Sequence, residues 1–185
     1  MSSKLHIDRA ARTVLAGGIV AYPTEAVYGL GCLPFEYHAV AHLIGLKRRS
    51  ASKGFLLIAA EFRQLRHIVS LPEGPLREEI LSTWPGPVTW ALPARSRMPD
   101  WLTGGRETVA VRVTDHPLAS ALCRRAGHAL VSTSANLSGR EPIRSVLRVR
   151  RQLGGLVDYV LPGALGDLER PTAIRDGRTG EILRA

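Results

Sequence analysis

The 185-residue sequence is poor in cysteine and in aromatic residues, and none of its apolar runs is long enough to cross a bilayer. The N-terminal stretch MSSKLHIDRA lacks the apolar core of a signal peptide, so we expect a cytoplasmic protein with no membrane partner. The two cysteines, Cys32 and Cys123, have neither CxxC spacing nor neighbouring histidines. We therefore expect partly buried, reduced thiols at both positions, and neither a disulfide nor a zinc site.

Aromatic residues make up only 5% of the chain, and none lies among the basic residues, which argues against an RNA-binding module that stacks bases. Positive charge is abundant: 25 Lys and Arg oppose 16 Asp and Glu, which gives a net charge of +9, and arginine supplies most of it. A positive field concentrates anions, and the planar guanidinium suits phosphate. The composition is thus compatible with a nucleotide or nucleic-acid partner, and equally with an excess of solvated arginines.

Several familiar motifs are missing, and each absence excludes a class of site. The dinucleotide fingerprint GxGxxG fails because Pro34 stands where its last glycine belongs. Neither the phosphate-binding GxxxxGK[ST] nor the serine-hydrolase GxSxG occurs. His38 and His42 have helical i, i+4 spacing, but Ala39 replaces the glutamate of the zinc signature HExxH. These histidines are expected on a helix surface.

Hydrophobic periodicity alternates between helix and strand along the whole chain, which predicts an α/β protein with one mixed sheet. No internal repeat or long linker divides it, so residues 1–185 are expected to form a single domain. Helices are expected at 7–16, 37–46, 61–69, 75–84, 116–127 and 145–155, and strands at 19–23, 54–60, 87–94, 108–114, 129–135, 156–161, 172–176 and 181–185.

Polar residues directly after apolar strands are the first place to look for a site, because ligands of open α/β sheets bind at strand ends. In YPTEAVYGLG, residues 22–31, Thr24 and Glu25 offer a hydroxyl and a carboxylate, and Gly29 and Gly31 allow a tight turn or a close approach to a ligand. A simple strand-end turn that caps a helix is the alternative.

Four cations, Lys47, Arg48, Arg49 and Lys53, occupy the short connection between a predicted helix and a predicted strand. Such runs are usually solvated surface. Their position between two core elements instead favours an anion such as a triphosphate, since rigid supports hold the charges in place.

A cluster of small hydrogen-bonding groups, Ser132, Thr133, Ser134 and Asn136, follows another buried strand and is typical of either a phosphate contact or a helix-capping loop.

One arginine, Arg112, lies inside an alternating strand. It must reach water, a carboxylate partner or an anionic ligand. For the helix that follows, we expect Asp115 to be the N-cap.

Taken in order, these stretches resemble the YrdC-like family over nearly the whole chain. The specific element is a KxR motif followed at a distance by SxN, which here comprises Lys47, Arg49, Ser134 and Asn136. The resemblance implies one α/β domain, without the C-terminal extension of longer relatives, in which a twisted mixed sheet with flanking helices opens a large, positively charged cavity.

The family's activity implies a nucleotidyltransferase that makes L-threonylcarbamoyladenylate from L-threonine, bicarbonate and ATP and releases pyrophosphate. The product serves formation of threonylcarbamoyladenosine at position 37 of tRNAs that read codons starting with A, through a downstream threonylcarbamoyl-transferase complex. Mg²⁺ is expected to arrive with ATP, without a metal site made by the protein alone. The rival hypothesis is a non-catalytic RNA-binding or ribosome-maturation protein that uses the same basic cavity. In either case the basic surface is a candidate contact for tRNA or RNA.

The resemblance also implies residue roles. The expected catalytic residues are Lys47, Arg49, Ser134 and Asn136. The expected ATP contacts are Lys47, Arg49, Thr108, Ser132, Ser134, Arg140 and Arg184, and the expected threonine contacts are Thr24, Arg112 and Thr172. Three positions depart from the family pattern: Ala26 stands where a threonine is frequent, Ser50 where a proline is frequent, and Thr172 where a serine is frequent.

Overall fold

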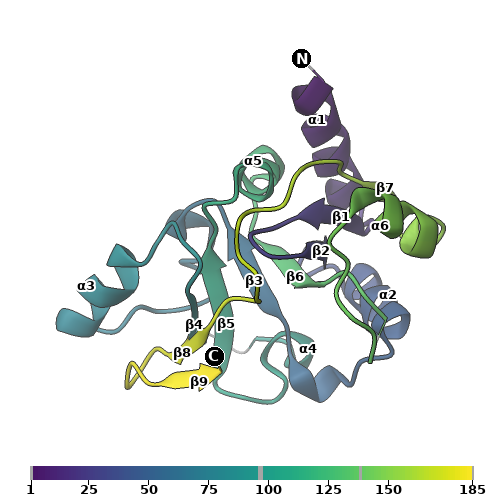
Figure 1. Ribbon diagram of the computed structural model, residues 1–185. Coiled ribbons are helices and arrows are strands. Elements are labelled where there is room, and N and C mark those ends of the chain that lie inside the picture. The colour runs from purple at the N-terminus through teal and green to yellow at the C-terminus, as the bar shows by residue number, and fades with distance from the viewer. Residues whose placement is uncertain (1, 96–97, 138, 185) are drawn as a thin grey trace.

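A single mixed sheet supports the molecule (Figure 1). The computed structural model describes residues 2–95, 98–137 and 139–184, and in this part of the chain nine strands pair in the order β7-β1-β2-β6-β3-β5-β4-β8-β9. The strands are β1 (Val20–Pro23), β2 (Tyr28–Gly31), β3 (Leu56–Ala59), β4 (Thr89–Pro93), β5 (Thr108–Val113), β6 (Leu130–Ser134), β7 (Tyr159–Val160), β8 (Ile174–Asp176) and β9 (Ile182–Arg184). The helices are α1 (Ser2–Leu15), α2 (Tyr37–Lys47), α3 (Pro75–Ser82), α4 (Asp100–Thr103), α5 (Pro117–Ala126) and α6 (Val146–Leu153).

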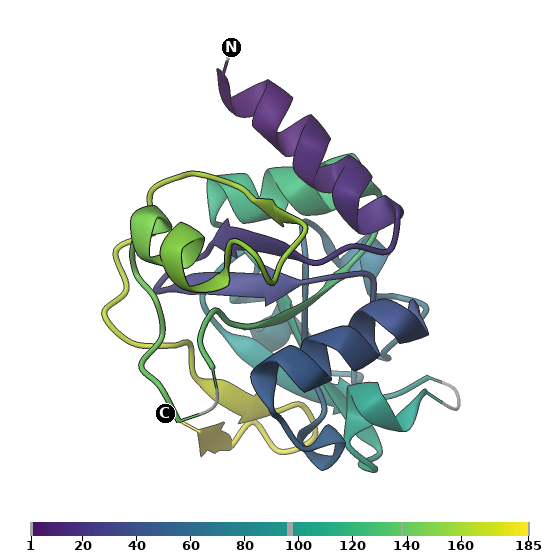
Figure 2. The same ribbon diagram turned by 90° about the vertical axis from the view of Figure 1, so that its right-hand side faces the viewer.

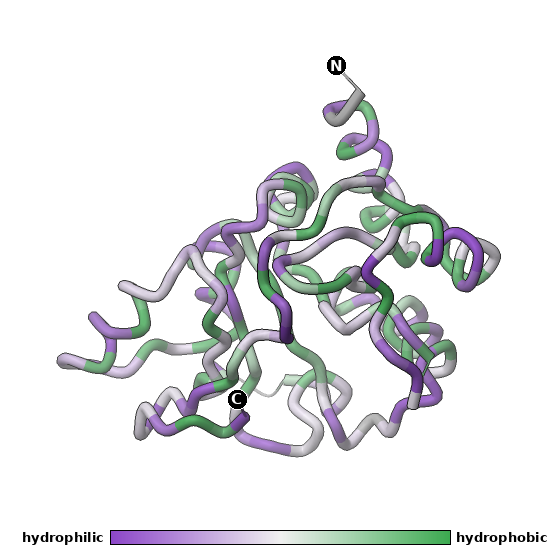
Figure 3. The backbone as a smooth tube through the Cα atoms, viewed as in Figure 1, coloured by the Kyte–Doolittle hydropathy of each residue, from purple (hydrophilic) through white to green (hydrophobic). Residues whose placement is uncertain are grey.

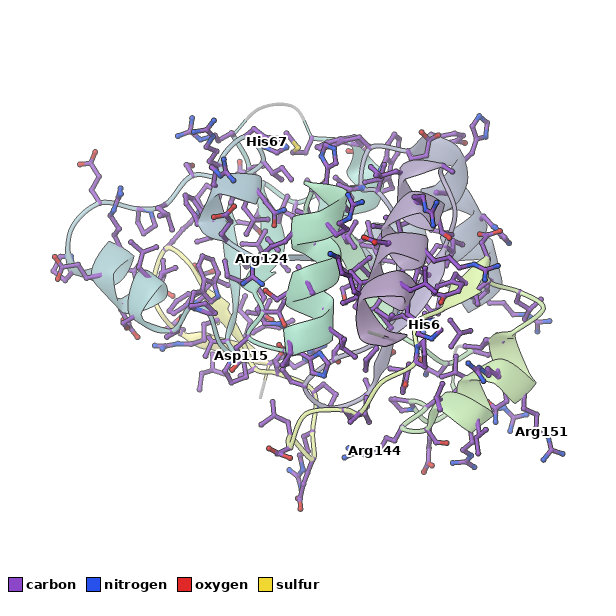
Figure 4. The ribbon with its side chains drawn as sticks, turned by 90° about the horizontal axis from the view of Figure 1, so that it is seen from above. His6, His67, Asp115, Arg124, Arg144 and Arg151 are labelled. Carbon is purple, nitrogen blue, oxygen red and sulfur yellow. The ribbon has the colours of Figure 1, made fainter. Side chains whose placement is uncertain are left out.

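Two helices from distant parts of the sequence, α1 and α5, pack side by side on one face of the sheet, as Figures 1 and 4 show. Apolar residues of both helices, including Val14 and Leu122, are fully buried against Tyr22, Ile58 and Leu130 of the strands. The opposite face packs into a larger apolar cluster together with α2, which lies on that side in Figure 2. Hydrophobic residues concentrate in the central strands, whereas hydrophilic residues line α6 (Figure 3).

Part of the sheet face on which α1 and α5 pack, called the first face below, is left uncovered. Successive side chains of a strand point to opposite faces, and Ile58 pairs with both Arg112 of β5 and Leu130 of β6. Two residues earlier on β3, Leu56 pairs with Ala110 and Ser132 and shares the face of Ile58. Helix α5 covers this face at the Ile58 end, so small and polar residues remain accessible beyond it.

Most predicted elements are present, and two local expectations are wrong. Residues 61–69 do not form a helix beyond a 3-10 turn at Phe62–Gln64, because the end of this segment pairs with the end of β4. The Val69 backbone forms a bridge with Ala94. Asp115 is not the N-cap of α5, since the Nδ1 atom of His116 accepts the Ala119 N–H at 3.4 Å.

The stretch of residues 22–31 is a hairpin rather than a turn that caps a helix. Strand β2 pairs antiparallel to β1, and the Thr24 N–H donates to the Val27 carbonyl at 3.1 Å to close the loop. Gly31 is required in the strand because a Cβ atom there would lie 2.4 Å from the Val131 carbonyl oxygen and 2.8 Å from the Tyr22 ring.

This packing predicts opposite effects of adding a methyl group at two glycines. Gly31→Ala should lower the free energy of unfolding by about 1–3 kcal/mol, because backbone and a buried ring would have to shift. Gly45→Ala, in α2 where nothing lies within 4 Å, should raise it by about 0.5–1 kcal/mol. Urea unfolding of both variants checks this, and equal effects would contradict the packing described at Gly31.

Candidate active site

A cavity of about 420 Å³ occupies the uncovered part of the first face. Its floor is made by the inward residues of the central strands, with Leu56, Ala91 and Ala110 in adjoining register positions. Eight of the site residues predicted from the sequence line it: Thr24, Arg49, Thr108, Arg112, Ser132, Ser134, Thr172 and Arg184. Three do not, namely Lys47, Asn136 and Arg140.

Positive charge dominates the lining. Among the described lining residues, five are cationic and one is a carboxylate: Arg49, Lys53, Arg106, Arg112 and Arg184 against Glu25. Arg106 was missed by sequence reasoning because its loop carries no motif. Its guanidinium reaches the KxR connection by donating to the Lys53 carbonyl at 2.9 Å. A cavity of this charge favours polyanions.

Lys47 lies behind the cavity wall and joins the two halves of the KxR and SxN motif. Its ammonium donates to the Ser134 carbonyl at 2.5 Å, the Asn136 carbonyl at 2.7 Å and the Asn136 Oδ1 at 2.6 Å. The residue is 4% exposed, and burial, with a smaller effect of the nearby Arg49 charge, lowers the Lys47 pKa to about 8. Lys47 thus fixes the turn after β6 rather than facing the cavity.

The same turn is closed by its own side chains. The Ser134 hydroxyl donates to the Asn136 Oδ1 at 2.6 Å, and the Asn136 amide donates to the Arg140 carbonyl at 2.5 Å. Arg140 therefore supports the turn through its backbone while its side chain is exposed outside the cavity lining. Only Ser134 of these three residues lines the cavity.

Arg49 is held by few partners. Its Nη2 donates to the Gly54 carbonyl at 3.0 Å, its guanidinium lies 5.3 Å from the Phe55 ring centroid, and its buried Nε has no partner among the described atoms. Burial lowers the Arg49 pKa, and the neighbouring charges of Arg106 and Arg184 lower it further. A bound anion would offset this repulsion.

Arg112 has a carboxylate partner, which is one of the three alternatives that its strand-interior position left open. Its Nη2 lies 2.9 Å from Glu25 Oε2, its Nη1 donates to the Thr172 hydroxyl at 2.6 Å, and both charged side chains are at most 7% exposed. The Thr24 hydroxyl donates to the Val27 carbonyl at 2.7 Å, which leaves its oxygen as an acceptor toward the cavity. The three predicted threonine contacts therefore all line the same cavity.

The donor set gives little support for a protein-held metal. No group of three or more His, Cys, Asp or Glu residues in the described ranges is arranged around a common point. The cavity's single described carboxylate, Glu25, is already paired with Arg112. Cys32 and Cys123 are both fully buried, more so than the sequence led us to expect, and burial raises the pKa of each thiol to about 12.

The family model described as "Telomere recombination", Sua5/YciO/YrdC, matches residues 12–185. The chain belongs to this family. A curated relative from Nitrosococcus oceani, named threonylcarbamoyl-AMP synthase, is 55% identical to this chain, and the alignment covers 95% of each protein. A relative of the same name from Halorhodospira halophila is 57% identical, and the alignment covers 96% of this chain and 93% of the relative.

Solved structures of the Sua5/YciO/YrdC family agree with the fold. P. abyssi Sua5 complexed with L-threonine superposes with a TM-score of 0.83 at 32% identity over 92% of this chain, which spans 50% of that longer chain. E. coli YciO superposes with a TM-score of 0.83 at 26% identity over 98% of this chain and 89% of that one. The α/β class with one mixed sheet is confirmed. Among the described residues, no helix has the length and apolar character needed to cross a membrane.

The environment of Lys47 predicts a titration near neutral pH. The ε-carbon resonance of Lys47 should shift with a midpoint of about pH 8 in the folded protein, whereas an unfolded lysine titrates near 10.5. Since the unfolded chain then holds its proton more tightly, the free energy of unfolding should rise between pH 8 and 10.5 in the wild type relative to Lys47→Met. A midpoint of 10 or above would contradict the burial described here.

Proposed function

We propose that this protein is an L-threonylcarbamoyladenylate synthase, which joins L-threonine, bicarbonate and ATP and releases pyrophosphate. The observation that carries the proposal is one cavity lined by Arg49 and Ser134 of the family motif and also by Arg112 and Thr172. The names of the curated relatives and the threonine complex of P. abyssi Sua5 support the same activity.

The chemistry requires two anions to meet. The threonine amine takes up the carbon of bicarbonate with loss of water, and the resulting carbamate oxygen attacks the α-phosphorus of ATP while pyrophosphate leaves. Repulsion between carbamate and polyphosphate slows this step unless fixed cations offset it. The transfer needs positioning and charge stabilisation and no side-chain nucleophile.

We assign the residues to two subsites. At the ATP subsite, Arg49 and the Ser134 hydroxyl contact phosphate oxygens, while Lys47 and Asn136 hold the turn that presents Ser134. The proposed further ATP contacts are Thr108, Ser132 and Arg184; Arg140, which the sequence led us to expect as a contact, has its side chain outside the cavity lining. At the threonine subsite, Arg112 binds the carboxylate, and Thr24 and Thr172 supply hydroxyls.

Mg²⁺ enters this scheme with the nucleotide. The cavity offers it one described carboxylate that is already paired, so the polyphosphate oxygens of ATP and water are its expected ligands. When bound, the ion neutralises charge on the leaving pyrophosphate.

Residues 1–185 act in this proposal as one catalytic domain in the cytoplasm. The adenylate passes to a second enzyme system that modifies tRNA. A direct tRNA contact is favoured by α6 and the segment before it, where Arg144, Arg148, Arg150 and Arg151 are exposed. Arg144 and Arg151 both lie at the surface in Figure 4. None of Arg148, Arg150 and Arg151 forms an ion pair with a described carboxylate, so their charges are available to neutralise phosphates.

The proposed reaction predicts that pyrophosphate is released from ATP only when threonine and bicarbonate are both present. Arg49→Ala should lower kcat/KM for ATP on the order of 100-fold, since one charge on the phosphates is lost. Arg124→Ala, on the exposed surface of α5 (Figure 4), is the control and should be unchanged. Salt-sensitive RNA binding without turnover would support the rival non-catalytic role instead.

The subsite assignment predicts that Arg112→Lys raises the KM for threonine at least tenfold and changes the KM for ATP less than twofold. Lysine keeps the charge beside Glu25 but loses the planar fork that binds Glu25, Thr172 and a carboxylate together. Steady-state kinetics with each substrate varied in turn measures both constants. An altered ATP constant with normal threonine saturation would reverse the two subsites.

The arginines of α6 predict salt-dependent tRNA binding. Replacing Arg148, Arg150 and Arg151 by glutamine should weaken tRNA binding. The slope of the logarithm of the binding constant against the logarithm of the salt concentration should become shallower by about 0.9 for each lost phosphate contact. A matched variant with glutamine at the exposed Arg12, Arg66 and Arg77 carries the same net charge and should bind normally. Equal losses in both variants would mean that net charge, not this surface, attracts the tRNA.

A further inference from the structure

We infer that Glu25 is a specificity-determining residue of the threonine subsite: its carboxylate balances Arg112, so that the subsite selects a ligand carrying both a carboxylate and an ammonium group. The inference rests on the proposed function and concerns a residue to which the roles above give no contact with substrate.

The Glu25 carboxylate shares the guanidinium on which the threonine carboxylate is proposed to bind. Glu25 Oε2 lies 2.9 Å from Arg112 Nη2, and Arg112 Nη1 is taken by Thr172 at 2.6 Å. The Arg112 Nε is buried without a partner in the described structure, so this guanidinium is incompletely used. A buried charged donor left unpaired is costly, which favours a further acceptor at this site.

The carboxylate cannot readily turn away from Arg112. The Thr114 hydroxyl donates to Glu25 Oε1 at 2.5 Å, and the Leu168 N–H donates to the Glu25 backbone carbonyl at 3.1 Å. Gly166 packs so closely on the same residue that a Cβ atom there would lie 2.8 Å from the Glu25 carbonyl oxygen. Glu25 is therefore held on both its side chain and its backbone, and its negative charge is a fixed property of the subsite.

Charge balance then decides which ligands fit. Glu25 and Arg112 together are neutral, and a plain carboxylic acid would add a second carboxylate to one guanidinium. L-Threonine as a zwitterion adds no net charge and brings an ammonium group to offset the repulsion between the two carboxylates. The other four lining cations, Arg49, Lys53, Arg106 and Arg184, are left to attract the polyphosphate of ATP.

A structural role for Glu25 predicts a different result. If it only held Arg112 in place, its loss would weaken every carboxylate ligand alike. If its charge selects the ligand, its loss weakens threonine binding and strengthens binding of the same molecule without the amino group. The two ligands then move in opposite directions.

The test measures dissociation constants of L-threonine and (R)-3-hydroxybutyrate, which is threonine without its amino group, by calorimetry. The full chain is saturated with α,β-methylene-ATP and Mg²⁺, so that the nucleotide subsite is filled and no turnover occurs. The wild type should bind threonine at least tenfold more tightly than hydroxybutyrate. Glu25→Gln, which keeps the length and one acceptor oxygen, should reduce this ratio at least tenfold, with threonine weakened and hydroxybutyrate strengthened.

Thr114→Val is the matched control, because it removes one hydrogen bond to Glu25 and leaves the charge. Its ratio should stay within twofold of the wild type. Equal weakening of both ligands in Glu25→Gln overturns the inference, as does a wild type that binds both equally, a result that needs no folded variant. Wild-type turnover in the pyrophosphate assay with unchanged selectivity in Glu25→Gln refutes this inference alone, whereas absence of wild-type turnover refutes the proposed function.

Discussion

The ammonium group of Lys47 is the contact on which the site's architecture depends. Lys47 is the last residue of α2, and its ammonium group donates to backbone and side-chain oxygens of the turn after β6. These hydrogen bonds connect residues almost ninety positions apart in the sequence. Its partners are all neutral oxygens, which means that the charge is desolvated without being neutralised. A turn held in this way fixes Ser134 at the cavity wall, where its hydroxyl donates to Asn136 Oδ1 until it turns to a phosphate oxygen.

The rest of the cavity follows from strand alternation and from unequal coverage of one sheet face. Because α5 covers only the end of that face near Ile58, the polar and small residues of β5 and β6 stay accessible. Loops around the face contribute further cations, so five positively charged lining residues surround the single described carboxylate. Burial lowers the pKa of Arg49, and the neighbouring charges of Arg106 and Arg184 lower it further. Cations held this close together attract anions, which suits a reaction between a carbamate and a triphosphate.

The sequence was sufficient for the fold class because periodicity reports which face of an element is buried. The sequence wrongly predicted a helix at residues 61–69. The end of this segment pairs next to β4, and a local hydrophobic pattern does not show that a strand distant in the sequence lies beside it. The strand position of Arg112 correctly demanded a partner, yet choosing Glu25 needed the hairpin and β5 to be placed side by side. Arg106 and the outward side chain of Arg140 depend on loop conformation, which spacing does not encode.

The central claim is that one cavity holds ATP and threonine at opposite ends, with Arg49 and Arg112 as their respective anchors. A crystal structure of the protein with L-threonine, Mg²⁺ and a non-hydrolysable ATP analogue tests it most directly. The account predicts phosphate oxygens within hydrogen-bond distance of Arg49 and Ser134, and the threonine carboxylate on Arg112 in the same cavity. A nucleotide bound elsewhere, or a triphosphate seated on Arg112, would contradict it.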